Sequence, residues 1–140
     1  MLRYLPILGW THTVIGGLGT MFGAACTTLA LLMLLYGVYD FVHGLIYLMA
    51  GPQYIGYALE NLMQVATLSA MIAVPAVVVL ALYGVELFAG VGMLRRWPRA
   101  RIAGMLAVIP GLVLGLPGIL LGVGTVVVLN DDEVKAALAG

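Results

Sequence analysis

The sequence predicts an all-α integral membrane protein, built as a helical bundle. Hydrophobic residues make up 64% of the 140 residues and charged residues only 9%, whereas a soluble domain has roughly a quarter of its residues charged. Three long intervals contain no charge at all, and these lie between Arg3 and Asp40, between Glu60 and Glu86, and between Arg101 and Asp131. Each interval exceeds the about 20 residues that a helix needs to cross a bilayer. Backbone amides inside lipid must be paired locally, so these stretches are expected to be helices.

Two long helices are expected first. One covers residues 8–36, or continues as far as residue 50, and the other covers residues 55–94. Between them, residues 36–57 hold half of the aromatic side chains, which is typical of a membrane interface. The dipeptide Gly51-Pro52 is expected to separate the helices, because proline lacks an amide donor and restricts the residue before it.

A basic loop follows the second long helix. Residues 95–101 contain four of the six basic residues, namely Arg95, Arg96, Arg99 and Arg101. Basic loops are retained in the cytoplasm, so we expect this loop to be cytoplasmic. Two spans separate it from the amino terminus, which is then cytoplasmic as well. The expected location is the bacterial inner membrane.

The last apolar stretch allows two interpretations. Two prolines, Pro110 and Pro117, lie inside it, and proline interrupts a helix. We therefore favour two short helices, 102–115 and 118–129, which gives four transmembrane helices with the last two short. A single kinked span, giving three spans in total, is the alternative. A short surface helix is expected over 131–138, and the whole chain, residues 1–140, is expected to form one transmembrane domain.

His12 and Glu86 are the candidate intramembrane polar pair. His12 lies nine residues after Arg3, and Glu86 lies nine residues before Arg95. If both arginines mark the same interface, the two side chains lie at a similar depth, about 13 Å along each helix at about 1.5 Å per residue. Buried ionisable groups in membranes are costly unless paired, and they often mark ion paths. The pair is either a proton or cation site, or a hydrogen-bonded contact that holds two helices together.

Asp40, His43 and Glu60 form a second polar cluster, expected near the outer interface. Asp40 and His43 are three residues apart, so they share one helix face. Histidine and carboxylates bind divalent metals, but no third ligand has a recognisable spacing, so we expect hydrated side chains and no metal.

Glycines recur at four-residue spacing. The pairs are Gly19 with Gly23, Gly111 with Gly115, and Gly118 with Gly122. Such small-residue pairs let helix backbones approach closely in lipid. They serve either packing within one chain or the interface of a homo-oligomer.

Several stretches resemble a widespread group of small bacterial four-helix integral membrane proteins of uncharacterised function. These are residues 9–16 (GWTHTVIG), 90–101 (GVGMLRRWPRAR), 117–122 (PGILLG), 126–129 (VVVL) and 133–135 (EVK). They occur in the same order as in the group and extend over most of the chain. The resemblance implies four helices with both termini inside, and it implies no activity.

No phosphate-binding loop, nucleophile with a base, or His/Cys metal motif is present in the sequence. The net charge is zero, which does not favour nucleic acid as a partner. We therefore expect no enzymatic activity and no cofactor. The leading hypothesis is an accessory subunit of a larger membrane complex, or a self-associating scaffold, with the lipid bilayer as its surroundings. The alternative is a small homo-oligomeric ion or proton channel, or a transporter, that uses Glu86 and His12.

Overall fold

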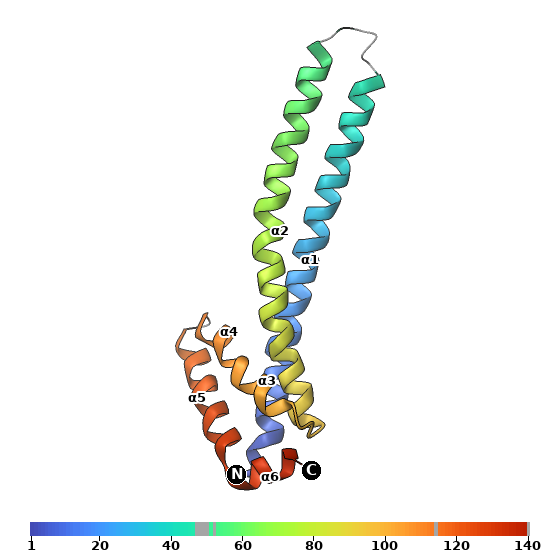
Figure 1. Cartoon of the computed structure of the whole chain (residues 1–140). Helices are drawn as coiled ribbons and strands as arrows, with labels where there is room; N and C mark the ends of the chain where they lie inside the picture. Colours follow the sequence, from blue (N-terminus) through green and yellow to red (C-terminus); the bar gives the residue numbers. More distant parts are fainter. Residues whose placement is uncertain (47–50, 52, 114, 140) are drawn as a thin grey trace. The chain divides into compact units, whose positions relative to one another are not determined.

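The computed structural model describes residues 1–46, 51, 53–113 and 115–139. Within this part, all regular secondary structure is helical (Figure 1), and the elements are η1 (Leu2–Tyr4), α1 (Leu5–Ile46), α2 (Gln53–Leu94), α3 (Ala100–Leu106), α4 (Val108–Val113), α5 (Leu116–Asn130) and α6 (Asp132–Ala139). The predicted all-α class is therefore confirmed. Contacts divide the chain into two compact units, unit 1 with Met1–Phe22 and Val79–Gly140 and unit 2 with Gly23–Val78. The single transmembrane domain expected from the sequence stays a prediction.

Helices α1 and α2 each contain 42 residues. Helix α1 begins at Leu5 and ends at Ile46, between the two predicted ends at residues 36 and 50. Helix α2 begins at Gln53, two residues before the predicted start, and ends at Leu94 as predicted. The regions Leu2–Ile46 and Tyr54–Leu94 are long and apolar enough to cross a membrane. Residues 47–50 and Pro52, on which part of the predicted helix break falls, lie outside the described residues.

Helix α2 ends in a turn that carries the basic loop. The amide of Trp97 donates to the Gly92 carbonyl at 2.9 Å, and the amide of Arg96 donates to the Met93 carbonyl at 3.3 Å. These two bonds form a Schellman motif, which satisfies carbonyls left open at a helix end. The motif needs a left-handed residue, and Arg96 takes that position with φ 54°, where glycine is usual.

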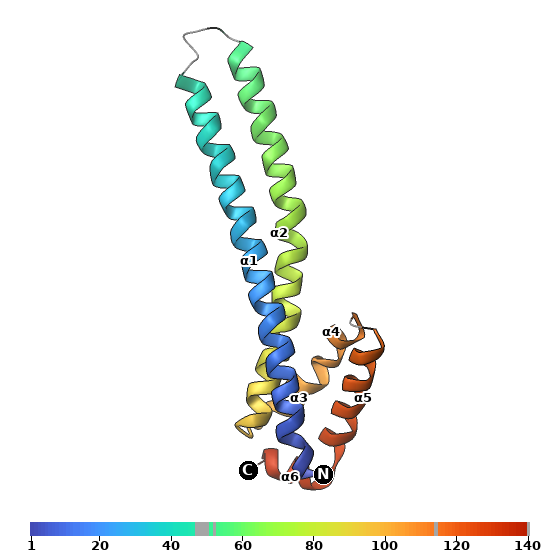
Figure 2. The same ribbon diagram turned by 180° about the vertical axis from the view of Figure 1, so that it is seen from behind.

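The last apolar stretch forms a hairpin of short helices, not one kinked helix. Helix α3 ends at Leu106, because Pro110 has no amide to donate to the Leu106 carbonyl. The predicted helix 102–115 is therefore divided at Ala107 into α3 and α4. Gly115, with φ 69°, then reverses the chain, and α5 begins with a proline in its first turn. Helices α4 and α5 pack against each other (Figure 2).

The apolar core of unit 1 receives side chains from five helices. They are Leu5 and Leu8 of α1, Ala89 and Met93 of α2, Ala100 and Ala103 of α3, Val128 and Leu129 of α5, and Val134 and Leu138 of α6, with Ala107 between α3 and α4. Val134 and Leu138 are four residues apart on α6, so they share one helix face, and both are buried. The amino-terminal amine also pairs with Glu133 at 3.1 Å. The two termini and the turn after α2 thus lie at the same end of unit 1 (Figure 1).

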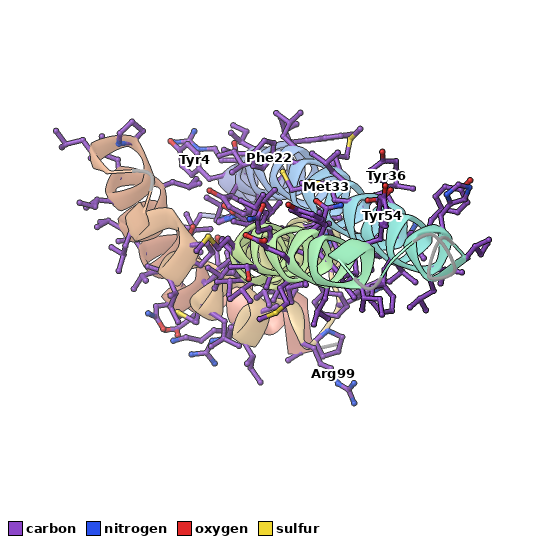
Figure 3. The ribbon with its side chains drawn as sticks, turned by 90° about the horizontal axis from the view of Figure 1, so that it is seen from above. Tyr4, Phe22, Met33, Tyr36, Tyr54 and Arg99 are labelled. Atoms are coloured by element: carbon purple, nitrogen blue, oxygen red, sulfur yellow. The ribbon has the colours of Figure 1, made fainter. Side chains whose placement is uncertain are left out.

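Unit 2 is an antiparallel pair formed by parts of α1 and α2, with small residues at the contact. A Cβ atom on Gly37 would lie 2.7 Å from Val65, and one on Gly44 would lie 2.7 Å from Ala58. Most large side chains of this unit are exposed, including Tyr36 and Tyr54 (Figure 3). Unit 2 consequently has almost no apolar core of its own.

The glycines predicted to pack have different environments. A Cβ atom on Gly19 would overlap the Tyr83 side chain, and one on Gly122 would lie 2.9 Å from Val108. Gly23 is buried. Gly111 faces Gly118 across the hairpin, because a Cβ atom on Gly111 would lie 3.1 Å from the Gly118 carbonyl oxygen. These residues are packed within the chain, and the homo-oligomer interface stays a prediction.

Gly115 is the exception, because it makes no close packing contact with the described residues of its own chain. A Cβ atom there would meet nothing within 4 Å, and the residue is needed for its positive φ.

Gly16→Ala is expected to destabilise unit 1, whereas Gly124→Ala is not. A methyl group on Gly16 would overlap the backbone of Leu87 on α2, and overpacking of this kind costs about 1–3 kcal/mol. A methyl group on Gly124 meets no atom within 4 Å, and alanine favours a helix over glycine by about 1 kcal/mol. Thermal unfolding in detergent, followed by circular dichroism, measures both. Equal melting temperatures for the two variants would contradict the close α1–α2 contact.

Candidate functional site

A buried network of three polar side chains joins three helices of unit 1. Nδ1 of His12, on α1, lies 3.2 Å from Oε1 of Glu86, on α2. Nε2 of the same ring lies 2.8 Å from Oγ1 of Thr125, on α5. Each of the three residues is at most 1% exposed. The structure thus places His12 and Glu86 in contact, as their matching depths along the two helices predict.

Glycines next to the polar residues explain how the helices come so close. Gly16 follows His12 by four residues, and Gly90 follows Glu86 by four residues, so each glycine lies on the same helix face as its polar neighbour. A Cβ atom on Gly16 would overlap the backbone of Leu87, and one on Gly90 would overlap Thr13. The α1 and α2 backbones therefore touch at these points. Because Gly16 and Gly90 have no side chains, the two helices are close enough for the His12 side chain to reach Glu86.

The hydrogen bonds assign the protons of the network. The Thr125 hydroxyl donates to the Leu121 carbonyl at 2.7 Å. A hydroxyl has one proton, so Thr125 accepts from His12, and Nε2 of the ring carries a hydrogen. A hydrogen bond across the 3.2 Å between Nδ1 of His12 and Oε1 of Glu86 requires one further proton, shared by the two atoms. Whichever atom holds it, the pair has no net charge, which is the arrangement that a site removed from water favours.

The second carboxyl oxygen of Glu86 is the unsatisfied atom of the network. Oε2 is buried and has no hydrogen-bond partner among the described residues. Buried polar atoms normally have partners. This oxygen is therefore the atom at which the network is able to accept one more donor.

Sequence reasoning missed Thr125. It is the one polar side chain between Leu116 and Leu129, in an otherwise apolar helix, and that isolation is the signal that identifies it. Thr11 and Thr13 flank His12 in the sequence, but their hydroxyls donate to the carbonyls of Ile7 and Gly9 in their own helix.

The polar cluster predicted from Asp40, His43 and Glu60 lies in unit 2 and is only partly assembled. Asp40 accepts a hydrogen bond of 2.6 Å from Asn61, the residue that follows the predicted cluster member Glu60. The His43 ring lies 5.8 Å from that of Tyr39. Asp40 and His43 line a shallow hollow of about 360 Å³ with Gly44, Tyr57, Ala58 and Asn61, whereas Glu60 is exposed and outside it. In the described part of the chain, no three His, Cys, Asp or Glu side chains group as metal ligands.

The four arginines of the basic loop are all exposed. Arg95 lies over the Trp97 ring at 5.7 Å, and Arg101 donates to Asn130 at 3.3 Å. Among the described residues, no carboxylate lies within salt-bridge distance of any of the four. Asp132 of α6 is paired with Lys135, which donates to it at 2.8 Å and thereby lowers the pKa of that carboxyl group.

Comparison with protein-family models, with curated proteins and with solved structures finds no match. The resemblance to small bacterial four-helix membrane proteins therefore stays a prediction.

Thr125→Val is expected to destabilise unit 1 because it leaves the Nε2 hydrogen of His12 without an acceptor. An unpaired buried donor costs about 1–3 kcal/mol, and valine keeps the shape of threonine. Thermal unfolding in detergent measures this loss, and the ¹⁵N signals of the His12 ring report the broken bond. Thr125→Ser retains the hydroxyl and is the matched control. A valine variant with unchanged stability and unchanged ring signals would contradict the proton assignment.

Proposed function

We propose that this chain is an integral membrane protein in which α1 and α2 cross the bilayer. The support is the exposure of apolar surface. In the apolar windows of both helices only 11% of the residues are buried, whereas the core helix of a soluble protein is mostly buried. Side chains such as Leu18, Leu32 and Met71 are more than half exposed. Lipid is the solvent in which such surfaces carry no penalty.

The proposed topology places both termini and residues 95–101 in the cytoplasm, at the bacterial inner membrane. The arginine content of that loop supports this orientation. The pairing of the amino-terminal amine with Glu133 is consistent with it, because it joins the two ends of the chain on one side of unit 1.

The hairpin of α3, α4 and α5 is proposed to enter the bilayer from the cytoplasmic side and return to it. The apolar helices Ala100–Leu112 and Leu116–Asn130 are shorter than the about 20 residues of a full span. Both ends of the hairpin adjoin the cytoplasmic elements, the basic loop and α6. This arrangement keeps both short helices in the bilayer, but it replaces the four transmembrane helices expected from the sequence with two spans and a re-entrant hairpin.

Within the membrane, we propose a non-enzymatic role as an accessory subunit of a larger membrane complex, or as a self-associating scaffold. The observation that carries this is the enclosure of the polar network. His12, Glu86 and Thr125 are closed off from the surface and tie three helices together, so they act as a structural contact. The groups that remain to meet a partner are apolar helix faces, which favours association with other helices in the bilayer.

The native mass of the complex, extracted gently from its own membrane, tests this role. A homo-oligomer of fixed number is the result expected of a scaffold, and a complex with larger, unrelated subunits is the result expected of an accessory protein. Mass spectrometry of the intact complex distinguishes the two. A monomer with no bound protein would contradict both forms of the proposal.

A second candidate function is a proton or cation channel, and the unpartnered Oε2 of Glu86 is the observation in its favour. In liposomes, this candidate requires pH-dependent flux that is lost in Glu86→Gln. Glu60→Gln is the matched control, because it removes an exposed carboxylate from the same helix. From the enclosure of the network we expect wild-type flux no greater than that of protein-free liposomes. Flux that depends on Glu86 but not on Glu60 would favour the channel.

A further inference from the structure

An apolar groove with an arginine at its edge runs along unit 1 between α2 and α3. Its volume is about 550 Å³. The α2 wall includes Gly84, Val85 and Phe88, the α3 wall includes Ile102 and Leu106, and Arg99 is the only charged residue in the lining. A Cβ atom on Gly84 would meet nothing within 4 Å, so the absence of a side chain at that position leaves the groove open.

A second hollow continues the groove toward the basic loop. It has a volume of about 350 Å³ and is lined by Phe88, Trp97, Pro98 and Arg99. Because both hollows share Phe88 and Arg99, they meet at those two residues. The Phe88 and Trp97 rings, 5.5 Å apart, form part of the junction. The apolar part of the groove is thus joined directly to an exposed cation.

The positive charge at this end of the groove has no counter-charge in the described chain. The Arg99 side chain extends away from the helices (Figure 3). Among the described residues, no carboxylate pairs with it, nor with Arg95 or Arg96. Two carboxylates of the tail are engaged elsewhere, Glu133 by the amino-terminal amine and Asp132 by Lys135. An anion from outside the chain is the complement that this surface lacks.

We propose that the groove binds one anionic phospholipid, with an acyl chain between α2 and α3 and the phosphate on Arg99. An acyl chain matches the apolar walls, and guanidinium binds phosphate through two parallel hydrogen bonds. Arg95 and Arg96 add positive charge at the headgroup level. Arg96 holds the left-handed position of the Schellman turn, where glycine would be less strained, so the basic side chain is present at a cost in backbone energy. A zwitterionic lipid fits less well, because its headgroup carries its own cation.

This inference rests on the proposed membrane location, and the following experiment separates the two. Trp97 lines the hollow beside Arg99 and is a natural probe. The other tryptophan, Trp10, is exposed on α1 and is replaced by Trp10→Phe. The resulting protein is reconstituted in phosphatidylcholine vesicles that contain a small fraction of either brominated phosphatidylglycerol or brominated phosphatidylcholine. Quenching of Trp97 fluorescence reports which lipid lies next to it.

The expected result is stronger quenching by the brominated anionic lipid, with a preference of about fivefold, as one arginine–headgroup contact supplies. Arg99→Gln is expected to remove this preference. Arg101→Gln is the matched control, because it removes the same charge from a residue that lies outside both hollows and bonds Asn130. Gly84→Leu fills the groove and is also expected to reduce the preference.

Equal quenching by the two lipids would overturn the lipid site while leaving the membrane location intact. The lipid site is also overturned if Arg101→Gln acts as strongly as Arg99→Gln, since the charge would then attract lipid without a specific site. If neither brominated lipid quenches Trp97, the protein is not in the bilayer, and the membrane proposal itself fails.

Discussion

The arrangement of unit 1 depends on the imidazole of His12, which bonds in two directions at once. Its two ring nitrogens meet Glu86 on α2 and Thr125 on α5, so one side chain fixes two helices relative to α1. Separating any of these helices leaves polar atoms without partners, at a cost of several kcal/mol each in a medium without water. Helices α1, α2 and α5, which the network joins, also contribute side chains to the apolar core of unit 1.

Glycine contacts make this network possible. In lipid, apolar side chains gain nothing by leaving the solvent, so close backbone contact and hydrogen bonds must hold the helices. Gly16 and Gly90 let the α1 and α2 backbones touch beside the polar pair. The same principle acts in unit 2, where Gly37 and Gly44 contact α2 and the Asp40–Asn61 bond is the polar tie. Unit 2 has no third helix among its described residues, which explains why its large side chains remain exposed.

The ionisable side chains of unit 1 fall into a buried pair, His12 with Glu86, and the exposed arginines of the basic loop. The ionisable groups of the interior satisfy one another except at a single oxygen of Glu86. The arginines of the basic loop, by contrast, have no carboxylate partner among the described residues, and one of them, Arg99, lines an apolar groove. In the proposed membrane setting, such a protein presents its arginines and apolar faces to lipid and to neighbouring helices. That distribution is the physical basis for proposing an accessory or scaffolding role and a bound anionic lipid.

The sequence by itself determined the all-α class, the two long helices, and the break between the last two helices near Gly115, whereas the further break between α3 and α4 was not predicted. These are local properties, set by apolar runs and by the backbone limits of proline and glycine. It also predicted that His12 and Glu86 would meet, because their distances from Arg3 and Arg95 match. Only the tertiary structure decided that Thr125 completes the network, that Glu60 does not join Asp40, and that Arg99 stands at the end of a groove. Each of these depends on how helices distant in sequence pack and rotate against one another, and no local pattern in the chain specifies that rotation.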